Sequence, residues 1–168
     1  MTKTMTKTLM KYALLLVLGL SLALTPGCSG GKQGPEKFET LDMSGVQKLI
    51  AANKGKVTLI MFWATWCPAC KTELPVLEQL RAKYPKDKLD ILALSVDDTD
   101  QAMHEYLKAR PTTLTVLMAK GDVSAEFGVR SIPSLVVFDG EGQVAFNSAG
   151  AYPFEMLDPV IGQLVKGP

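Results

Sequence analysis

One apolar run of nine residues, KVTLIMFWA (Lys56 to Ala64), constrains the fold of this chain more than any other feature. It is rich in β-branched and aromatic residues and does not alternate with polar ones, which is typical of a strand buried on both faces. Such a strand belongs to a sheet that helices cover on each side. The run therefore favours an α/β domain.

The segments that follow alternate between helical and strand-like patterns. Further strands are predicted at residues 88–96 and 113–119, and a hairpin is predicted from PSLVVFD and QVAFNSAG, joined by the turn GEG. Helices are predicted at about residues 42–53, 68–84, 97–110, 121–128 and 153–165. This order predicts a central mixed β-sheet flanked by helices.

The N-terminus has the pattern of an export signal. Several lysines precede an apolar run from Tyr12 to Leu24, and the run is thirteen residues long, which is short for a membrane span. These lysines are Lys3, Lys7 and Lys11. The pattern predicts a signal peptide at residues 1–27, and an uncleaved membrane anchor is the alternative.

Cys28 follows this segment directly, in the sequence TPGCSGG. The junction resembles the lipobox of bacterial lipoproteins, in which the cysteine thiol is acylated and becomes the mature N-terminus. The resemblance implies lipidation at Cys28, followed by a flexible Gly- and Lys-rich linker up to residue 37. The other interpretation is a stray cysteine in a cleaved segment.

Charge gives little support to a polyanionic partner. The full chain has 18 basic and 17 acidic residues, and the segment before Cys28 contains three of the lysines and none of the acids. No basic stripe or patch interleaved with aromatic residues is present in the sequence, so nucleic-acid binding has no support.

Two of the three cysteines, Cys67 and Cys70, follow the first buried strand at the predicted start of a helix. The free N–H groups and the dipole of a helix N-terminus stabilise a thiolate there, and the pKa of a thiol in a Cys-X-X-Cys motif can fall well below its usual value. Cys67 lies nearer the terminus and is predicted to attack, with Cys70 as the resolving thiol one turn later. Pro68 fits the first helical position, where its missing N–H is not needed.

Three interpretations of this cysteine pair compete. A structural disulfide gains little unfolded-state entropy by closing so short a loop. A zinc site needs four ligands, but the chain has no second Cys-X-X-Cys and its only histidine is His104. A redox centre is the interpretation that we favour, with no metal and no cofactor expected.

The segments FWATWCPACKTELP and FGVRSIPSLVVFDGEGQV give the chain its resemblance to known proteins. Together with the order of strands and helices, they resemble the thioredoxin superfamily, and within it the TlpA/ResA-like thiol–disulfide oxidoreductases of bacterial envelopes. The resemblance implies a thioredoxin-like domain at residues 38–168, with a helix–strand insertion at residues 98–120. It also implies that Pro133 is a cis proline that faces the disulfide. The residues that support the first motif are Trp63, Trp66, Pro68, Glu73 and Pro75.

Two positions raise questions within this resemblance. Thioredoxin has a buried aspartate six residues before its first cysteine, where this chain has Met61, so a base for Cys70 must come from elsewhere. Asp98 stands where ResA-like proteins place an active-site glutamate, and it could relay a proton or raise the pKa of a thiol. Alternatively, Asp97, Asp98 and Asp100 cap the following helix, which we favour.

Other acidic and aromatic residues of the motif have simpler interpretations. Glu73 is expected in the first helical turn as a partner of the helix dipole. Trp63 and Trp66 are expected to be aromatic residues of the core or of the rim of the site.

The resemblance implies an enzyme of the cell envelope that exchanges its Cys67–Cys70 disulfide with protein thiols. It favours a reductant, for example in cytochrome c maturation, that is re-reduced by a membrane electron donor and held at a membrane by its lipid. A thiol peroxidase and a non-catalytic thioredoxin-like binding module are the alternative functions. The first is disfavoured because the motif lacks the pairing of Thr and Arg that usually surrounds a peroxidatic cysteine.

Overall fold

A computed structural model of the chain describes residues 37–167. The predicted signal peptide, Cys28 and nearly all of the linker lie outside these residues. Within the described part of the chain, no helix is both long enough and apolar enough to span a membrane.

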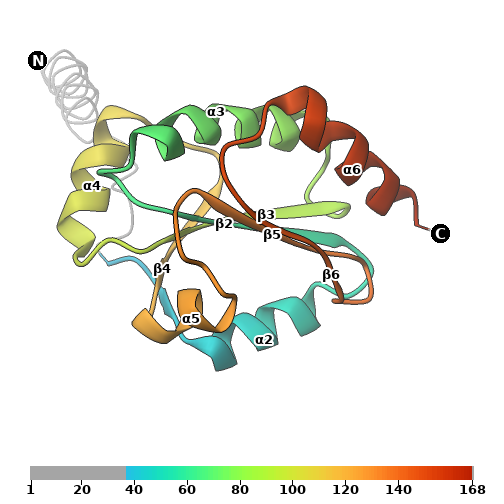
Figure 1. Ribbon diagram of the computed structural model, residues 1–168, viewed down its shortest axis with the longest axis horizontal. Coiled ribbons are helices and arrows are strands. Elements are labelled where there is room, and N and C mark those ends of the chain that lie inside the picture. The colour runs from blue at the N-terminus through green and yellow to red at the C-terminus, as the bar shows by residue number, and fades with distance from the viewer. Residues whose placement is uncertain (1–36, 168) are drawn as a thin grey trace, which may run out of the picture. The chain divides into compact units, whose positions relative to one another are not determined.

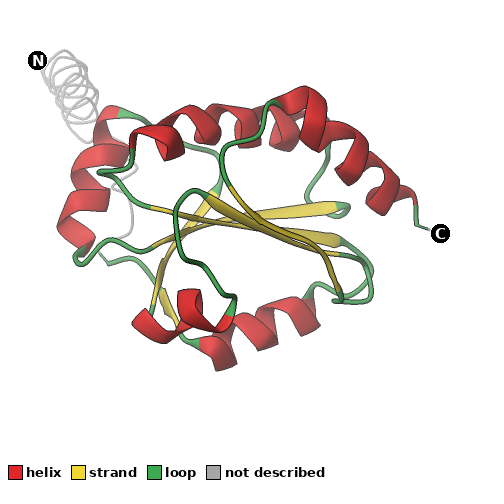
Figure 2. Ribbon diagram, viewed as in Figure 1, coloured by secondary structure: helices red, strands yellow, loops and turns green. Residues whose placement is uncertain are grey.

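The described residues form a six-stranded sheet with five helices (Figure 1, Figure 2). The strands are β1 (Thr40–Leu41), β2 (Val57–Trp63), β3 (Leu89–Ser95), β4 (Thr115–Ala119), β5 (Ser134–Phe138) and β6 (Val144–Ala149). The helices are α2 (Met43–Ala52), α3 (Pro68–Lys83), α4 (Asp100–Ala109), α5 (Gly121–Glu126) and α6 (Phe154–Lys166).

The sheet has the strand order β1-β4-β3-β2-β5-β6 and is mixed, as predicted. β1, β4, β3 and β2 run parallel to one another, whereas β5 is antiparallel to both β2 and β6. β2 is the central strand, and all seven of its residues are buried. Its continuous apolar sequence therefore reflects contact with helices on both faces.

The two faces of the sheet are covered by different helices (Figure 1). One core contains alternate β2 residues such as Leu59 and Met61, together with side chains of α3, α4 and α6. The other core contains Ile60 and Phe62 and includes residues of α2 and α5. The strand residues alternate between the cores because successive side chains point to opposite faces.

The structure departs from the predicted elements in two places. β1 was not predicted, because a two-residue strand has no periodicity to detect; it pairs with β4, Thr40 opposite Met118. α4 begins at Asp100, not at Asp97, so the acidic segment before it is a loop. The predicted insertion is present as α4 and β4, between the cysteines and Pro133.

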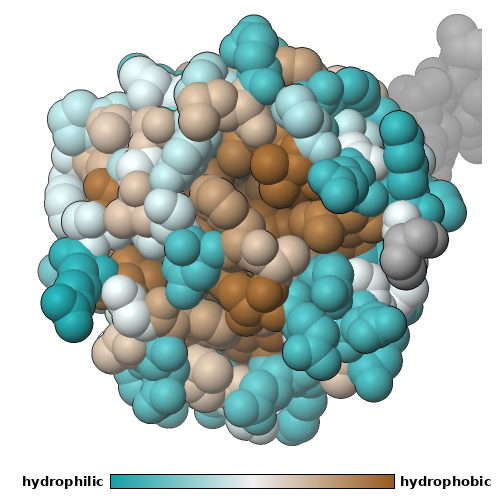
Figure 3. All heavy atoms as spheres, turned by 45° about the vertical axis from the view of Figure 1, so that its right-hand side comes forward, coloured by the Kyte–Doolittle hydropathy of each residue, from teal (hydrophilic) through white to brown (hydrophobic). Residues whose placement is uncertain are grey.

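Apolar residues also reach the surface near the β6 edge of the sheet. Figure 3, which brings the right-hand side of Figure 1 forward, shows apolar residues gathered in the centre of that face. The exposed large hydrophobic residues of β6 and α6 are Val144, Met156 and Val160. The remaining one in the described chain is Trp66, beside the cysteines.

Candidate active site

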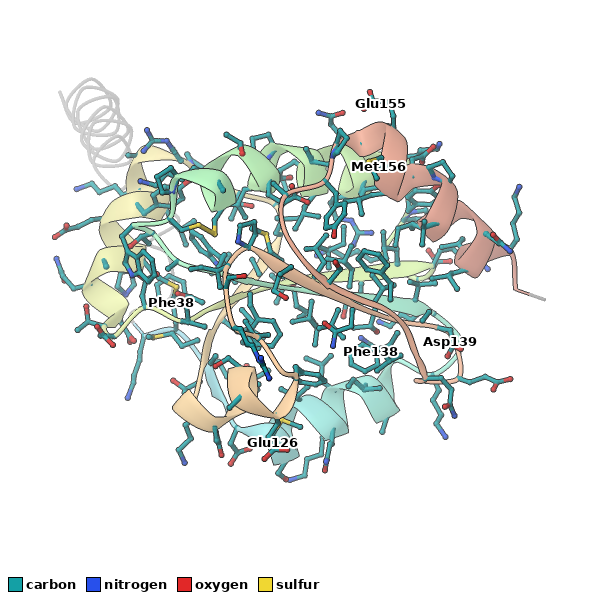
Figure 4. The ribbon with its side chains drawn as sticks, viewed as in Figure 1. Phe38, Glu126, Phe138, Asp139, Glu155 and Met156 are labelled. Carbon is teal, nitrogen blue, oxygen red and sulfur yellow. A yellow bond between two sulfur atoms is a disulfide. The ribbon has the colours of Figure 1, made fainter. Side chains whose placement is uncertain are left out.

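The cysteine pair lies at the start of helix α3, just after the end of the central strand β2. Cys67 is the N-cap residue of α3, and Pro68 occupies the start of the helix, as predicted. Cys67 and Cys70 are joined in a disulfide with their Cα atoms 5.3 Å apart. Figure 4 draws this disulfide as a yellow bond near the start of α3.

The two sulfur atoms have different surroundings. The Sγ of Cys67 accepts a hydrogen bond of 3.1 Å from the backbone N–H of Cys70, one of the free donors of the helix terminus. Cys67 retains 4% of its surface exposed, whereas Cys70 is fully buried. A negative charge on sulfur is therefore better stabilised at Cys67, and an approaching molecule meets Cys67 first.

Pro133 lies in the loop that passes the same sulfur. The Ile132–Pro133 peptide bond is cis, as the resemblance implies. The carbonyl oxygen of Ile132 is 3.7 Å from the Sγ of Cys67 and can accept a hydrogen bond from the thiol once the disulfide is reduced. The structure thus brings the carbonyl group of the cis Ile132–Pro133 peptide bond close to Cys67, 65 positions apart in the sequence.

Trp63 and Trp66 have opposite surroundings. Trp63 ends β2, is fully buried, and packs against Tyr106 of α4 with ring centroids 5.4 Å apart. Trp66 is 65% exposed and lines a hollow of about 240 Å³ with Val129, Arg130 and Ile132, among others. The sequence did not distinguish the two tryptophans; in the structure Trp63 is a core residue and Trp66 is exposed.

Glu73 was predicted wrongly as a partner of the helix dipole. It lies beyond the first turn of α3, one turn after Cys70, and only 1% of it is exposed. Its Oε2 accepts a hydrogen bond of 2.8 Å from the backbone N–H of Tyr152, and its Oε1 has no partner among the described residues. Burial raises the pKa of the Glu73 carboxyl, against a smaller lowering effect of the Tyr152 hydrogen bond.

The acidic segment after β3 does not cap α4. The N-cap residue is Thr99, and no side chain makes a capping hydrogen bond there. Asp98 is exposed to solvent. A role for Asp98 in catalysis stays a prediction, but the helix cap that we favoured is not formed.

Asp97 instead joins the two loops that leave β2 and β3. Its Oδ2 accepts hydrogen bonds from the Thr65 backbone N–H (2.9 Å) and from the Ser95 hydroxyl (2.7 Å). Its Oδ1 accepts a hydrogen bond of 2.7 Å from the Thr65 hydroxyl. Asp97 is 6% exposed and therefore well shielded from water.

A signal in the sequence pointed to Glu73, but none singled out Asp97. Cys70, Leu74, Leu77 and Leu80 form the buried stripe of α3, and the spacing of Glu73 from Cys70 places it on this stripe. For Asp97, consecutive aspartates after a strand do not show which one turns inward.

The comparisons with known proteins agree with this geometry. Residues 55–144 match the family model described as thioredoxin-like. The chain is 30% identical over 135 residues to the thiol-disulfide oxidoreductase ResA of Bacillus thuringiensis subsp. konkukian, covering 80% of this chain and 78% of that protein. It is 27% identical over 154 residues to the sporulation thiol-disulfide oxidoreductase A of Bacillus subtilis, covering 86% of this chain and 93% of that protein.

A solved structure extends the similarity to the fold. A secreted disulfide oxidoreductase of Mycobacterium tuberculosis, described as homologous to E. coli DsbE, superposes with a TM-score of 0.57 at 25% identity. The match covers 67% of this chain and 84% of that one.

Proposed function

The chain belongs to the thioredoxin-like family and is a thiol–disulfide oxidoreductase, and on that premise we propose that it reduces disulfides of proteins in the cell envelope. The observation that carries the proposal is the Cys67–Cys70 disulfide at the N-cap of α3, in which Cys67 keeps a small exposed area and Cys70 is fully buried. Cytochrome c maturation is one pathway in which such a reductant acts.

In the proposed reaction, the Cys67 thiolate attacks one sulfur of a substrate disulfide. A mixed disulfide forms, and the other substrate sulfur leaves as a thiolate. The Cys70 thiolate then attacks the Sγ of Cys67, which re-forms the Cys67–Cys70 disulfide and releases the second substrate thiolate. Two electrons pass to the substrate, and a membrane electron donor returns two electrons to the pair for the next cycle.

Cys70 must lose its proton before it attacks, and Glu73 is the group that we assign to this step. Met61 supplies no base from the strand, and Glu73 lies one turn from Cys70 in the same buried core. Its raised pKa makes the carboxylate a better proton acceptor, because proton transfer is favoured when the two pKa values approach each other.

Redox equilibration of the full chain in glutathione buffers tests the function. A reductant has a potential near that of thioredoxin, about −270 mV, whereas an oxidant lies near about −120 mV, as DsbA does. The reduced protein should also cleave the disulfides of insulin. An oxidising potential would contradict the direction of transfer, and an inert disulfide would favour a binding module. Faster oxidation of Cys67 by hydrogen peroxide than by protein disulfides, measured by stopped flow, would favour a peroxidase.

The cellular location is proposed from the N-terminal sequence. The apolar run and Cys28 support export and lipid anchoring, and the M. tuberculosis relative is described as secreted. Metabolic labelling with palmitate should therefore mark the full-length protein in its host, and Cys28→Ala should remove the label. A labelled Cys28→Ala variant would contradict lipidation at this residue.

A further inference from the structure

Asp97 occupies an unusual place for an aspartate, because it is buried between two loops and not on the surface. One loop leaves β3, where Asp97 itself lies, and the other leaves β2 and continues into Cys67. These strands are paired in parallel, with Trp63 opposite Ser95, so the two loops begin side by side at the C-terminal ends of the strands. The backbone N–H of Val96 bonds to the carbonyl oxygen of Trp63 at 2.8 Å, which closes the ladder just before the loops separate.

Beyond that point, hydrogen bonds to the Asp97 side chain connect the two loops. Thr65 offers it two donors, the backbone N–H and the hydroxyl, at 2.9 and 2.7 Å. Ser95, which is fully buried, donates to the carboxylate and accepts a 3.0 Å hydrogen bond from the backbone N–H of Asp97. The carboxylate is therefore held in place by Ser95 and holds Thr65 in turn. Hydrogen bonds to an ionised acceptor are stronger than neutral ones, which suits this clamping role.

Thr65 lies two residues before Cys67, so its position sets where the cysteine enters the helix. The Sγ of Cys67 must stay in line with the N–H of Cys70 and close to the carbonyl of Ile132. Only one residue, the exposed Trp66, separates Thr65 from Cys67. A shift of Thr65 is thus transmitted directly to Cys67.

We infer that Asp97 is a positioning residue for the attack by Cys67, acting through Thr65. The inference rests on the proposed function, because it assigns to the loop a part in the exchange reaction. It also separates Asp97 from its neighbour Asp98, which has the same charge one residue away but is exposed.

The test uses the reduced full chain and a small aromatic disulfide, 5,5′-dithiobis(2-nitrobenzoate), whose first thionitrobenzoate release reports the attack by Cys67. Asp97→Ala should slow this release at least about tenfold, since a displacement of a reacting group by about 1 Å can cost as much as about a hundredfold. Asp97→Asn keeps the shape of the side chain and should slow it less. Asp98→Ala and Asp98→Asn are the matched controls and should react at the wild-type rate.

The pH profile of the same release separates positioning from charge. Both Asp97 variants remove one negative charge, but only alanine frees Thr65 and weakens the alignment of Cys67 with the helix N–H groups. The pH at which the rate of the first release is half its maximum should therefore be higher for Asp97→Ala than for Asp97→Asn. Glu73, the other buried carboxyl of the site, is unchanged in both variants.

Thr65→Val provides a second route if Asp97→Ala does not fold, since it removes the hydroxyl donor alone. Thr65→Val should also slow the first thionitrobenzoate release. The same substitution should slow this release less when it is made in the Asp97→Asn variant. Wild-type rates and coincident pH midpoints in these variants would overturn the inference while leaving the proposed function intact. Failure of the wild-type protein to reduce insulin would instead overturn the proposed function.

Discussion

The two sides of the cysteine pair each hold one buried carboxylate, and they bind it in different ways. On the loop side, both oxygens of Asp97 accept hydrogen bonds from Thr65 or Ser95. On the helix side, Glu73 accepts a single hydrogen bond from Tyr152, and its second oxygen has no partner within residues 37–167. A carboxylate whose two oxygens both accept hydrogen bonds fixes geometry. A buried carboxylate with one oxygen that accepts no hydrogen bond is suited to take up a proton.

This difference predicts that the two carboxylates act on different steps. Asp97 should affect the attack by Cys67, and Glu73 should affect the resolution by Cys70.

Glu73→Gln should slow the second thionitrobenzoate release, which reports resolution by Cys70, by about a hundredfold near neutral pH, the lower end of what a general base contributes. The first release should stay near the wild-type rate. The matched control is Glu78→Gln on the same helix, because the Glu78 carboxylate is bound by Thr112 and Thr113, away from the cysteines. Equal slowing of both phases would show that Glu73 has no separate role.

The stability of the two glutamine variants should depend on pH with opposite signs. The pKa of Glu73 is raised in the folded protein, so its favourable contribution is complete below the unfolded value and is lost as the pH rises through the folded pKa. The glutamine of Glu73→Gln cannot titrate. The free energy of unfolding of this variant should therefore rise relative to that of the wild type as the pH increases from about 4 to 7.

Glu78 has the opposite shift. Burial acts to raise its pKa, but the hydrogen bonds from Thr112, Thr113 and Leu114 outweigh burial and lower it. Its stabilising contribution is present above the unfolded pKa and is lost as the pH falls through the folded one, so Glu78→Gln should be less stable than the wild type at pH 7 and nearly equal at low pH. Urea unfolding across this pH range measures both variants, and parallel curves would contradict the comparison.

Tyr152→Phe should have the smallest effect. Glu73 is bound by the backbone N–H of Tyr152, whereas the Tyr152 hydroxyl contacts Ser148 at 2.5 Å and the Ala149 carbonyl at 3.2 Å. Removing the hydroxyl should lower the free energy of unfolding by about 1 kcal/mol or less. The second thionitrobenzoate release should keep the wild-type rate and pH profile, and a marked change would show that the side chain takes part on the Glu73 side.

Much of the fold followed from local sequence patterns. The buried runs of β2 and β3 and the helix after the cysteines have strong periodicity and well-defined ends, and the structure has them within a few residues of their predicted bounds. The strand order did not follow, because pairing between β1 and β4 or between β2 and β5 is set by long-range packing. Two residues of β1 are too few to show a pattern.

The site was predictable to the extent that it is local. The cysteines and Pro68 lie within one helical turn, and their arrangement follows from helix geometry. Glu73 was misjudged because an acidic residue near a helix start is usually exposed, although its spacing from Cys70 placed it on the buried stripe. The choice between Asp97 and Asp98 depends on where Thr65 and Ser95 lie, which only the folded sheet determines.

The central claim is that Cys67 attacks and Cys70 resolves, and single-cysteine variants test it most directly. Reduced Cys70→Ala and Cys67→Ala would each be mixed with one equivalent of the aromatic disulfide, and the adducts would be followed by absorbance and by intact mass. Cys70→Ala should form one stable mixed disulfide on Cys67 at close to the wild-type rate of the first phase. Cys67→Ala should react far more slowly, because Cys70 is fully buried. Equal rates of adduct formation in the two variants, or faster reaction at Cys70, would contradict the account.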